Sequence, residues 1–243
     1  MNEQIIPIPI DIVFTIIFTL ISLILGILMI LRYFKYKIRE LFFAGITWCL
    51  ITSPFWGDII SYLWYLFFNA PLSDFSYFFL TIGLIPIAHV TWMFFFTSFF
   101  LKKNQKLIVA VFFIEAIMFE IVFIYLLIAN PSFIGTRVPL ISVQWSMFII
   151  LYFILSMLLF LITGITFTFQ SFKSDSKDTN LKGKFLLIAF VSFMIGIIIE
   201  LAPIFFDLKY LLSRLIILSA AIEFYIGFTL PNWIKKIFLE ETY

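Results

Sequence analysis

The chain has 243 residues, of which 63% are hydrophobic and 12% are charged, and its formal net charge is +2. Soluble globular domains carry about 45–50% apolar and about 25% charged residues, so this chain has too few charges to cover a water-facing surface. The composition excludes an ordinary soluble enzyme, a nucleic-acid-binding protein and a disordered chain. It predicts an all-α, polytopic integral membrane protein.

Seven apolar runs follow one another along the chain, separated by polar or proline-bearing breaks. They lie at about 11–34, 40–66, 74–101, 107–129, 141–170, 184–206 and 209–231. A membrane-spanning helix needs about 20 apolar residues, so each run is long enough to cross a bilayer. We predict a single seven-helix transmembrane domain over residues 1–243. The start of the chain lacks the basic region and cleavage site of a signal peptide, so the first run is expected to be a retained helix.

Lysine and arginine are distributed unevenly between the two sides of this predicted bundle. Thirteen of them fall in the breaks after helices one, three and five or in the C-terminal tail, whereas only Arg137 and Lys209 fall on the opposite side. Cytoplasmic loops carry an excess of these residues. We therefore expect the N-terminus outside and the C-terminus inside, in the cell membrane. This arrangement requires an odd number of spans.

Ionisable residues inside the predicted spans are the candidate residues of a ligand site or ion pathway, because charges inside a bilayer are costly. They are Asp58, His89, Glu115, Glu120, Glu200, Arg214 and Glu223.

Glu200 and Arg214 are predicted to form a pair between helices six and seven. Each lies about seven residues from a turn expected near 207–208, so at about 1.5 Å per residue both sit about 10 Å from it. Arginine stays protonated and therefore demands a carboxylate or a water-filled cavity. Two interpretations are open. The pair is static and fixes the register of the helices, or it forms part of a ligand or counter-ion site that opens outward.

His89 and Glu120 are predicted to meet near the midplane of the bilayer. Both lie at a similar distance from a break centred near Asn104. A carboxylate beside an imidazole is an arrangement used in proton relays and pH sensors, and it also serves as a plain polar clamp. Glu115 and Glu120 are about 140° apart on their helix, so at most one faces inward. Glu115 and Glu223 have no obvious cation and are expected to be neutral, or to line a cavity for a cation or proton.

The second helix is expected to kink at Pro54, because proline removes a backbone hydrogen bond. Asp58 follows the kink and either lines a cavity or lies at the membrane interface. Four aromatic residues cluster on the same outer segment. They are Trp56, Tyr62, Trp64 and Tyr65. Such a cluster anchors a helix at the interface, or it forms an aromatic box for an amine or an apolar ligand.

A weak internal repeat is also suggested by the sequence. Asp58 follows Pro54 in helix two, and Glu200 precedes Pro203 in helix six, after a basic loop in each case. A parallel 3+1+3 repeat would place helices one to three over helices five to seven.

Several catalytic motifs do not occur in the sequence, including HExxH, GxxxxGK[ST], GxSxG and cysteine–histidine clusters. We therefore expect no enzymatic activity, no metal and no cofactor. The lipid bilayer and a small molecule or ion are the partners that this composition indicates.

The end of the seventh run resembles a known type of sensor. The segment Gly227-Phe-Thr-Leu-Pro231-Asn-Trp233-Ile-Lys235-Lys236 is similar to the exit from the seven-helix membrane region at the N-terminus of some histidine kinases. This resemblance implies a sensory or receptor-like module without its own output enzyme.

We therefore predict a receptor-like or sensory membrane protein with an outward-facing pocket between helices two, three, six and seven. Cytoplasmic signalling proteins would contact the loops at 102–106 and 171–184. The alternative is a small proton- or cation-coupled transporter of the seven-helix type. A polar path that reaches both faces would favour transport, and one that reaches only the outer face would favour sensing.

Overall fold

The computed structural model describes residues 10–138, 142–201 and 209–239. Over these residues the fold is almost entirely helical, with one small antiparallel hairpin, as the composition predicts. The α-helices are α1 (Ile10–Tyr36), α2 (Arg39–Leu50), α3 (Trp56–Phe68), α4 (Asp74–Ile82), α5 (Ile85–Phe100), α6 (Gln105–Ala129), α7 (Met147–Phe172), α8 (Lys177–Leu201), α9 (Lys209–Thr229) and α10 (Asn232–Leu239). The strands are β1 (Gly135–Val138) and β2 (Ser142–Trp145).

Seven helical segments are long and apolar enough to cross a bilayer, which confirms the predicted number. They are Ile12–Tyr36, Arg39–Phe68, Asp74–Phe100, Lys102–Ala129, Met147–Phe172, Lys177–Glu200 and Leu211–Thr229. The second and third are each built from two α-helices, α2 with α3 and α4 with α5. The predicted turn near 207–208 lies outside the described residues.

Two predicted helix starts were wrong. The fifth helix begins at Met147 rather than near 141, because Ser142–Trp145 pairs with β1 as a hairpin strand. Ser146 then caps α7, its hydroxyl accepting a hydrogen bond from the Ile149 amide at 3.4 Å. The sixth helix begins at Lys177 rather than near 184. Its first two turns are polar, and a pattern based on apolar residues does not detect a helix that continues beyond the hydrocarbon.

The predicted break at Pro54 is confirmed. A short 3₁₀ turn, Ser53–Phe55, separates α2 from α3. Thr52 satisfies groups that the break would otherwise leave free, since its hydroxyl donates to the Cys49 carbonyl at 2.7 Å. The same hydroxyl accepts a hydrogen bond from the Trp56 indole nitrogen at 3.0 Å. α3 therefore starts anew after the break, with Asp58 in its first turn.

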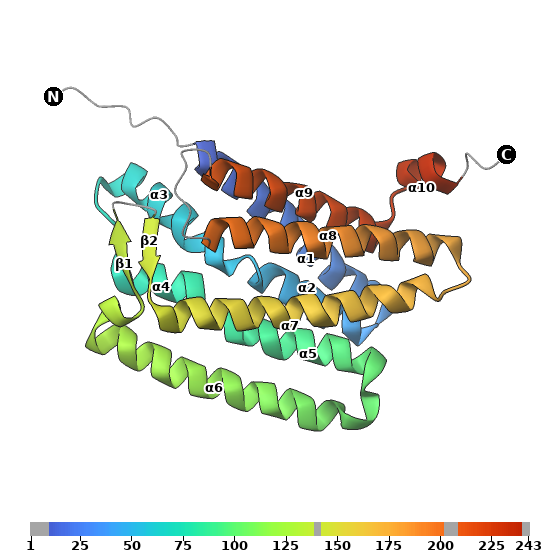
Figure 1. Ribbon diagram of the computed structural model, residues 1–243, viewed down its shortest axis with the longest axis horizontal. Coiled ribbons are helices and arrows are strands. Elements are labelled where there is room, and N and C mark those ends of the chain that lie inside the picture. The colour runs from blue at the N-terminus through green and yellow to red at the C-terminus, as the bar shows by residue number, and fades with distance from the viewer. Residues whose placement is uncertain (1–9, 139–141, 202–208, 240–243) are drawn as a thin grey trace.

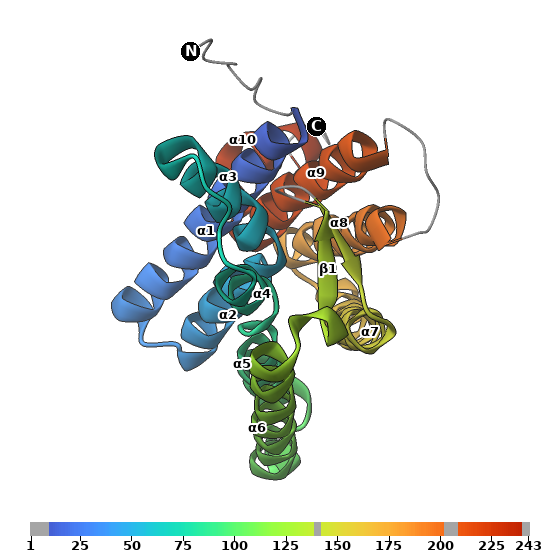
Figure 2. The same cartoon turned by 90° about the vertical axis from the view of Figure 1, so that its left-hand side faces the viewer.

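Six of the seven spans form a ring. In order around it are α1, α2, α5, α7, α8 and α9, each in contact with the next, and α9 closes the ring on α1. α6 packs mainly against α5 and lies outside this ring, as the view along the bundle shows (Figure 2). Only 17% of the apolar window of the α6 span is buried, against 67% for the α4–α5 span, so α6 is the peripheral helix.

The two ends of the bundle differ in composition. The basic loops after α1, α5 and α7, together with α10, gather at one end, which we call the basic end (Figure 1). The hairpin, the α3–α4 connection, the start of α1 and the start of α9 lie at the other, which we call the hairpin end (Figure 1).

An aromatic core fills the half of the ring toward the basic end. Trp48, Trp92, Phe95, Phe190 and Phe224 belong to it, and each is at most 5% exposed. Their rings meet edge to face or tilted, as with Phe190 and Phe224 at 4.9 Å between centroids. This geometry is favourable for aromatic pairs.

Candidate functional site

The ring encloses a cavity of about 600 Å³ on the hairpin side of the aromatic core. It begins at Gln144 and Trp145 of β2 and reaches Trp92 of α5 and Phe224 of α9. Six spans contribute lining residues, and α6 contributes none of those described. A volume of this size is typical of sites for small organic molecules.

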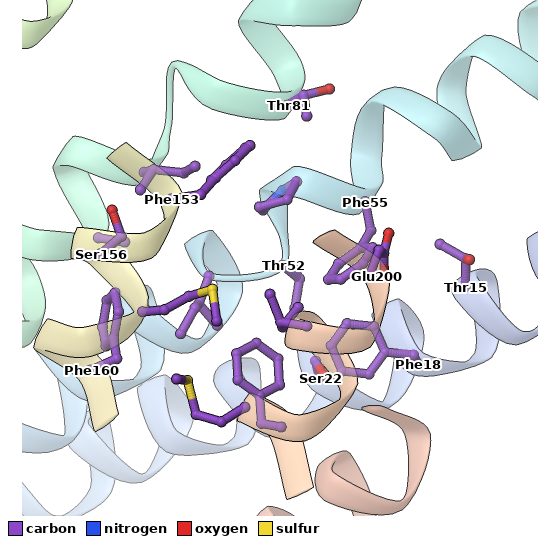
Figure 3. Close-up of a pocket in the computed structure, with 18 of the residues that line it drawn as sticks. Thr15, Phe18, Ser22, Thr52, Phe55, Thr81, Phe153, Ser156, Phe160 and Glu200 are labelled. Atoms are coloured by element: carbon purple, nitrogen blue, oxygen red, sulfur yellow. The ribbon is translucent and has the colours of Figure 1, made fainter. Parts of the chain in front are cut away.

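Aromatic side chains make up much of the wall. Phe18 and Phe55 lie on one side of the cavity, and Phe153 and Phe160 of α7 lie on the other (Figure 3). The aromatic residues of the lining that lie toward the basic end form what we call the aromatic floor. These are Trp48, Trp92, Phe160, Phe190 and Phe224.

Twelve of the 33 described lining residues are polar or charged. The uncharged ones are Thr15, Ser22, Thr47, Thr52, Tyr77, Thr81, Gln144 and Ser156. The charged ones are Asp58, Glu200, Lys209 and Arg214. An apolar wall with a few convergent polar groups is the usual composition of a binding pocket.

Arg214 is the centre of the charged group. Its NH1 donates to Glu200 Oε2 at 2.7 Å, and its NH2 lies 3.6 Å from Asp58 Oδ2. Its guanidinium carbon sits over the Phe55 ring, 4.6 Å from the centroid. The Arg214 side chain is only 6% exposed, whereas those of Asp58 and Glu200 are 14% and 21% exposed. The cavity therefore reaches the two carboxylates more readily than the cation between them.

Close packing of α8 and α9 positions this pair. The Ser213 hydroxyl lies 3.0 Å from both the Gly196 carbonyl and Glu200 Oε2. A Cβ at Gly196 would meet the Ile217 side chain at 2.5 Å, so glycine permits this approach. The hydrogen bonds that Glu200 accepts from Ser213 and Arg214 both end on Oε2.

A second arginine extends the network toward the hairpin. The Tyr77 hydroxyl donates to Asp58 Oδ1 at 2.5 Å, and the Arg137 guanidinium lies over the Tyr77 ring at 4.4 Å. Arg137 also donates to the Leu72 carbonyl at 2.5 Å and pairs with Asp74 at 3.2 Å. The network thus joins β1, α4, α3, α9 and α8 at the hairpin end.

The predicted contact between Glu200 and Arg214 is confirmed. Asp58 lines the cavity rather than projecting beyond the bundle. The sequence analysis did not anticipate that Asp58 would join the same arginine, because the break at Ser53–Phe55 sets its direction. It also missed Tyr77 and Arg137. Arg137 was assigned only to a loop, and no spacing rule connects it to a tyrosine 60 residues earlier.

The predicted pairing of His89 with Glu120 is wrong. His89 Nδ1 lies 3.4 Å from Glu115 Oε2, and the Tyr152 hydroxyl donates to Glu115 Oε1 at 3.1 Å. The break between the helices is centred nearer to the chain start than Asn104, since α5 ends at Phe100 and α6 begins at Gln105. Measured from these ends, His89 and Glu115 lie at nearly equal depth.

His89, Glu115, Glu120 and Glu223 are absent from the lining of the cavity. Among the described residues, one buried oxygen on each of Glu120 and Glu223 has no hydrogen-bond partner, and neither does His89 Nε2. These residues therefore lie apart from the cavity, and the structure gives them no common site.

The outer aromatic cluster does not form a box around the cavity. Trp56, Tyr62, Trp64 and Tyr65 are absent from its lining. Trp64 is 39% exposed, which agrees with the interfacial interpretation. Within the described part of the chain, no group of three or more His, Cys, Asp or Glu side chains is placed to hold a metal ion.

No known family model matches this chain, and the curated proteins compared with it include no detectable relative. The case for function therefore depends on the geometry of the cavity and its surroundings.

Proposed function

We propose that this protein is a receptor-like or sensory protein of the cell membrane that binds a small ligand in the cavity at the hairpin end. The observation that carries the proposal is the cavity itself, at about 600 Å³, with convergent charged groups and lining residues from six spans. A ligand in such a position contacts most of the bundle and can favour one arrangement of its helices over another.

The distribution of charge along the cavity supports sensing. The lining residues extend along α1 as far as Ser22 and along α9 as far as Phe224, and the deepest of them are uncharged. Charged lining residues occur toward the hairpin end, in the early part of α3 and α9 and the late part of α8. A polar path toward one face is what a sensory site requires, and the labelling experiment below separates such a site from a transporter that opens to each face in turn.

A direct connection exists between the cavity and the basic end. Arg214 and Phe224 both lie on α9, and the chain continues through Leu230 into α10. Lys235 of α10 forms an ion pair with Asp178 of α8. A ligand that displaces α9 would thus move the α9–α10 junction, which packs against the start of α8 beside the α7–α8 loop. By the positive-inside rule, this loop and the α5–α6 connection at 102–106 face the cytoplasm, where they would contact signalling proteins.

Cysteine labelling from each side of the membrane tests this proposal. Ser156→Cys places a thiol in the cavity wall, in a Cys49→Ala background that removes the single native cysteine. In sealed vesicles, an impermeant methanethiosulfonate should label position 156 from the extracellular side only. Thr168→Cys, in the filled half, should react from neither side because Thr168 is fully buried. Labelling of position 156 from the cytoplasmic side, or from neither, would overturn the proposal.

A coupled transporter is the second candidate, and one observation favours it. Around the ring, α1, α2 and α5 are followed by α7, α8 and α9, with α6 outside, an order compatible with a 3+1+3 repeat. A transporter must expose its site alternately to both faces. Labelling of Ser156→Cys from both sides would therefore select transport over sensing.

A further inference from the structure

We infer that the ligand of the cavity is a small organic cation with an apolar or aromatic body, held by its charged group at Glu200 and Asp58. This inference rests on the proposed function in assuming that the cavity is a binding site, but it does not depend on whether the protein senses or transports.

Accessibility of the charges is the first argument. Glu200 is 21% exposed and Asp58 14%, whereas Arg214 is 6% exposed and its guanidinium face is covered by the Phe55 ring. Both Arg214 terminal nitrogens point to carboxylates. Lys209, the other cation in the lining, is likewise buried, with 6% of its surface exposed. The two carboxylates are therefore the most accessible charged groups of the cavity.

Unused acceptor capacity is the second argument. A carboxylate offers about four lone-pair positions on its two oxygens. Among the described residues, Glu200 accepts hydrogen bonds from Arg214 and Ser213, both through Oε2 and none through Oε1. Figure 3 shows Glu200 turned toward the cavity beside Phe55. An ammonium group would supply the donor that this oxygen lacks.

The aromatic wall is the third argument. Organic cations are attracted to the faces of aromatic rings, most strongly where water is excluded. Phe18 packs edge to face against Phe55, with their centroids 5.1 Å apart, close to Glu200 (Figure 3). Phe153, Phe160 and Trp92 form apolar surface farther from the carboxylates. The cavity therefore offers accessible carboxylates in one region, beside the more buried Arg214 and Lys209, and apolar surface in another.

Three probes of one shape and different charge test the inference on the full chain in nanodiscs. They are 3-phenylpropylamine, 3-phenylpropanol and 3-phenylpropionate, and binding is followed by tryptophan fluorescence, because Trp48, Trp92 and Trp145 line the cavity. A hydrogen bond to a charged group contributes about 1.5–3 kcal/mol, so we expect the amine to bind about tenfold or more tightly than the alcohol. The inference would be overturned if 3-phenylpropionate bound as tightly as the amine or more tightly. It would also be overturned if none of the three probes showed saturable binding.

Glu200→Gln should lower the affinity for the amine about tenfold and leave that for the alcohol unchanged. Glu223→Gln is the matched control, since Glu223 also lies within a span but does not line the cavity. An equal effect of the two substitutions on the amine would contradict the assignment.

A labelling measurement keeps the test independent of how Glu200→Gln folds. Two thiol reagents are compared at position 156 with all native charges kept, a trimethylammonium methanethiosulfonate and a sulfonate one. The ratio of the cationic to the anionic reaction rate should be higher for Ser156→Cys than for Ser132→Cys in the loop. A ratio at position 156 equal to that at position 132 would contradict the inference. If position 156 were labelled from the cytoplasmic side and still preferred the cationic reagent, the proposed sensory role would be contradicted. The inference that the ligand is a cation would not be affected.

Discussion

Arg214 shows at the residue scale how a buried charge is accommodated in this bundle. A guanidinium cannot lose its proton, so it requires compensation wherever it is buried. Glu200 supplies a close partner at 2.7 Å, Asp58 a more distant one at 3.6 Å, and Phe55 a ring against its face. Only the first of these could be predicted from the sequence, because a tight turn places residues at equal distances from it side by side. The other two depend on the break in the second span.

Replacing Arg214 should lower the free energy of unfolding more than replacing Glu200. Arg214→Met leaves the carboxylates of Glu200 and Asp58 close together without compensation, and breaking a buried pair in this way typically costs about 3–5 kcal/mol. Glu200→Gln should cost less, because Arg214 keeps Asp58 and the amide oxygen still accepts. Denaturant unfolding in mixed micelles measures both. A larger loss for Glu200→Gln than for Arg214→Met would contradict this reading of the network.

The corrected partner of His89 gives a second prediction at this scale. His89→Ala and Glu115→Ala should be non-additive, with a coupling free energy of about 0.5–3 kcal/mol for residues in contact. His89→Ala and Glu120→Ala should add to within about 0.5 kcal/mol, as expected of residues that do not touch. Two double-mutant cycles on thermal unfolding separate the cases. Coupling to Glu120 and none to Glu115 would restore the pairing that the sequence suggested.

At the scale of elements, the apolar runs predicted the spans well because a bilayer demands about 20 apolar residues per helix. The hairpin at Gly135–Trp145 was not predicted, since its second strand continues directly into an apolar helix. The start of α8 was placed too late for the related reason that its first turns are polar.

The contacts between helices inside the bundle could not be predicted from the hydropathy pattern either. α1 and α2 approach closely at Gly26 and Gly45, where an added Cβ would meet backbone.

Gly45→Ala tests this close approach. A Cβ at Gly45 would lie 2.6 Å from the Gly26 carbonyl oxygen, and small residues allow membrane helices such contact. Alanine has a higher helix propensity than glycine by about 1 kcal/mol, yet we expect a net loss of about 1–3 kcal/mol from overpacking. Ala110→Val on the exposed side of α6 is the control and should change unfolding by at most about 0.5 kcal/mol. A stabilising effect of Gly45→Ala would show that the helices do not meet there.

At the scale of the whole molecule, the basic loops and the cavity lie toward opposite ends of the bundle. The basic loops gather at one end of the bundle (Figure 1), and the aromatic core lies on that side of the cavity. The charged residues of the cavity lie toward the hairpin end. The number of spans and the asymmetry of charge could be read from the sequence. The ring of six spans and the outlying α6 could not, because which helices touch is decided by side-chain fit rather than by hydropathy. The predicted 3+1+3 repeat agrees with the ring order and remains a prediction.

The central claim is that seven spans place the cavity end outside and the basic end inside, and loop labelling tests it most directly. In the Cys49→Ala background, cysteines replace Ser132 beside the hairpin and Asp175 in the α7–α8 loop, both of which are exposed. In right-side-out vesicles an impermeant thiol reagent should label position 132 and leave position 175 untouched, and inside-out vesicles should give the reverse. Labelling of both positions from one side, or of position 175 from outside alone, would contradict the account.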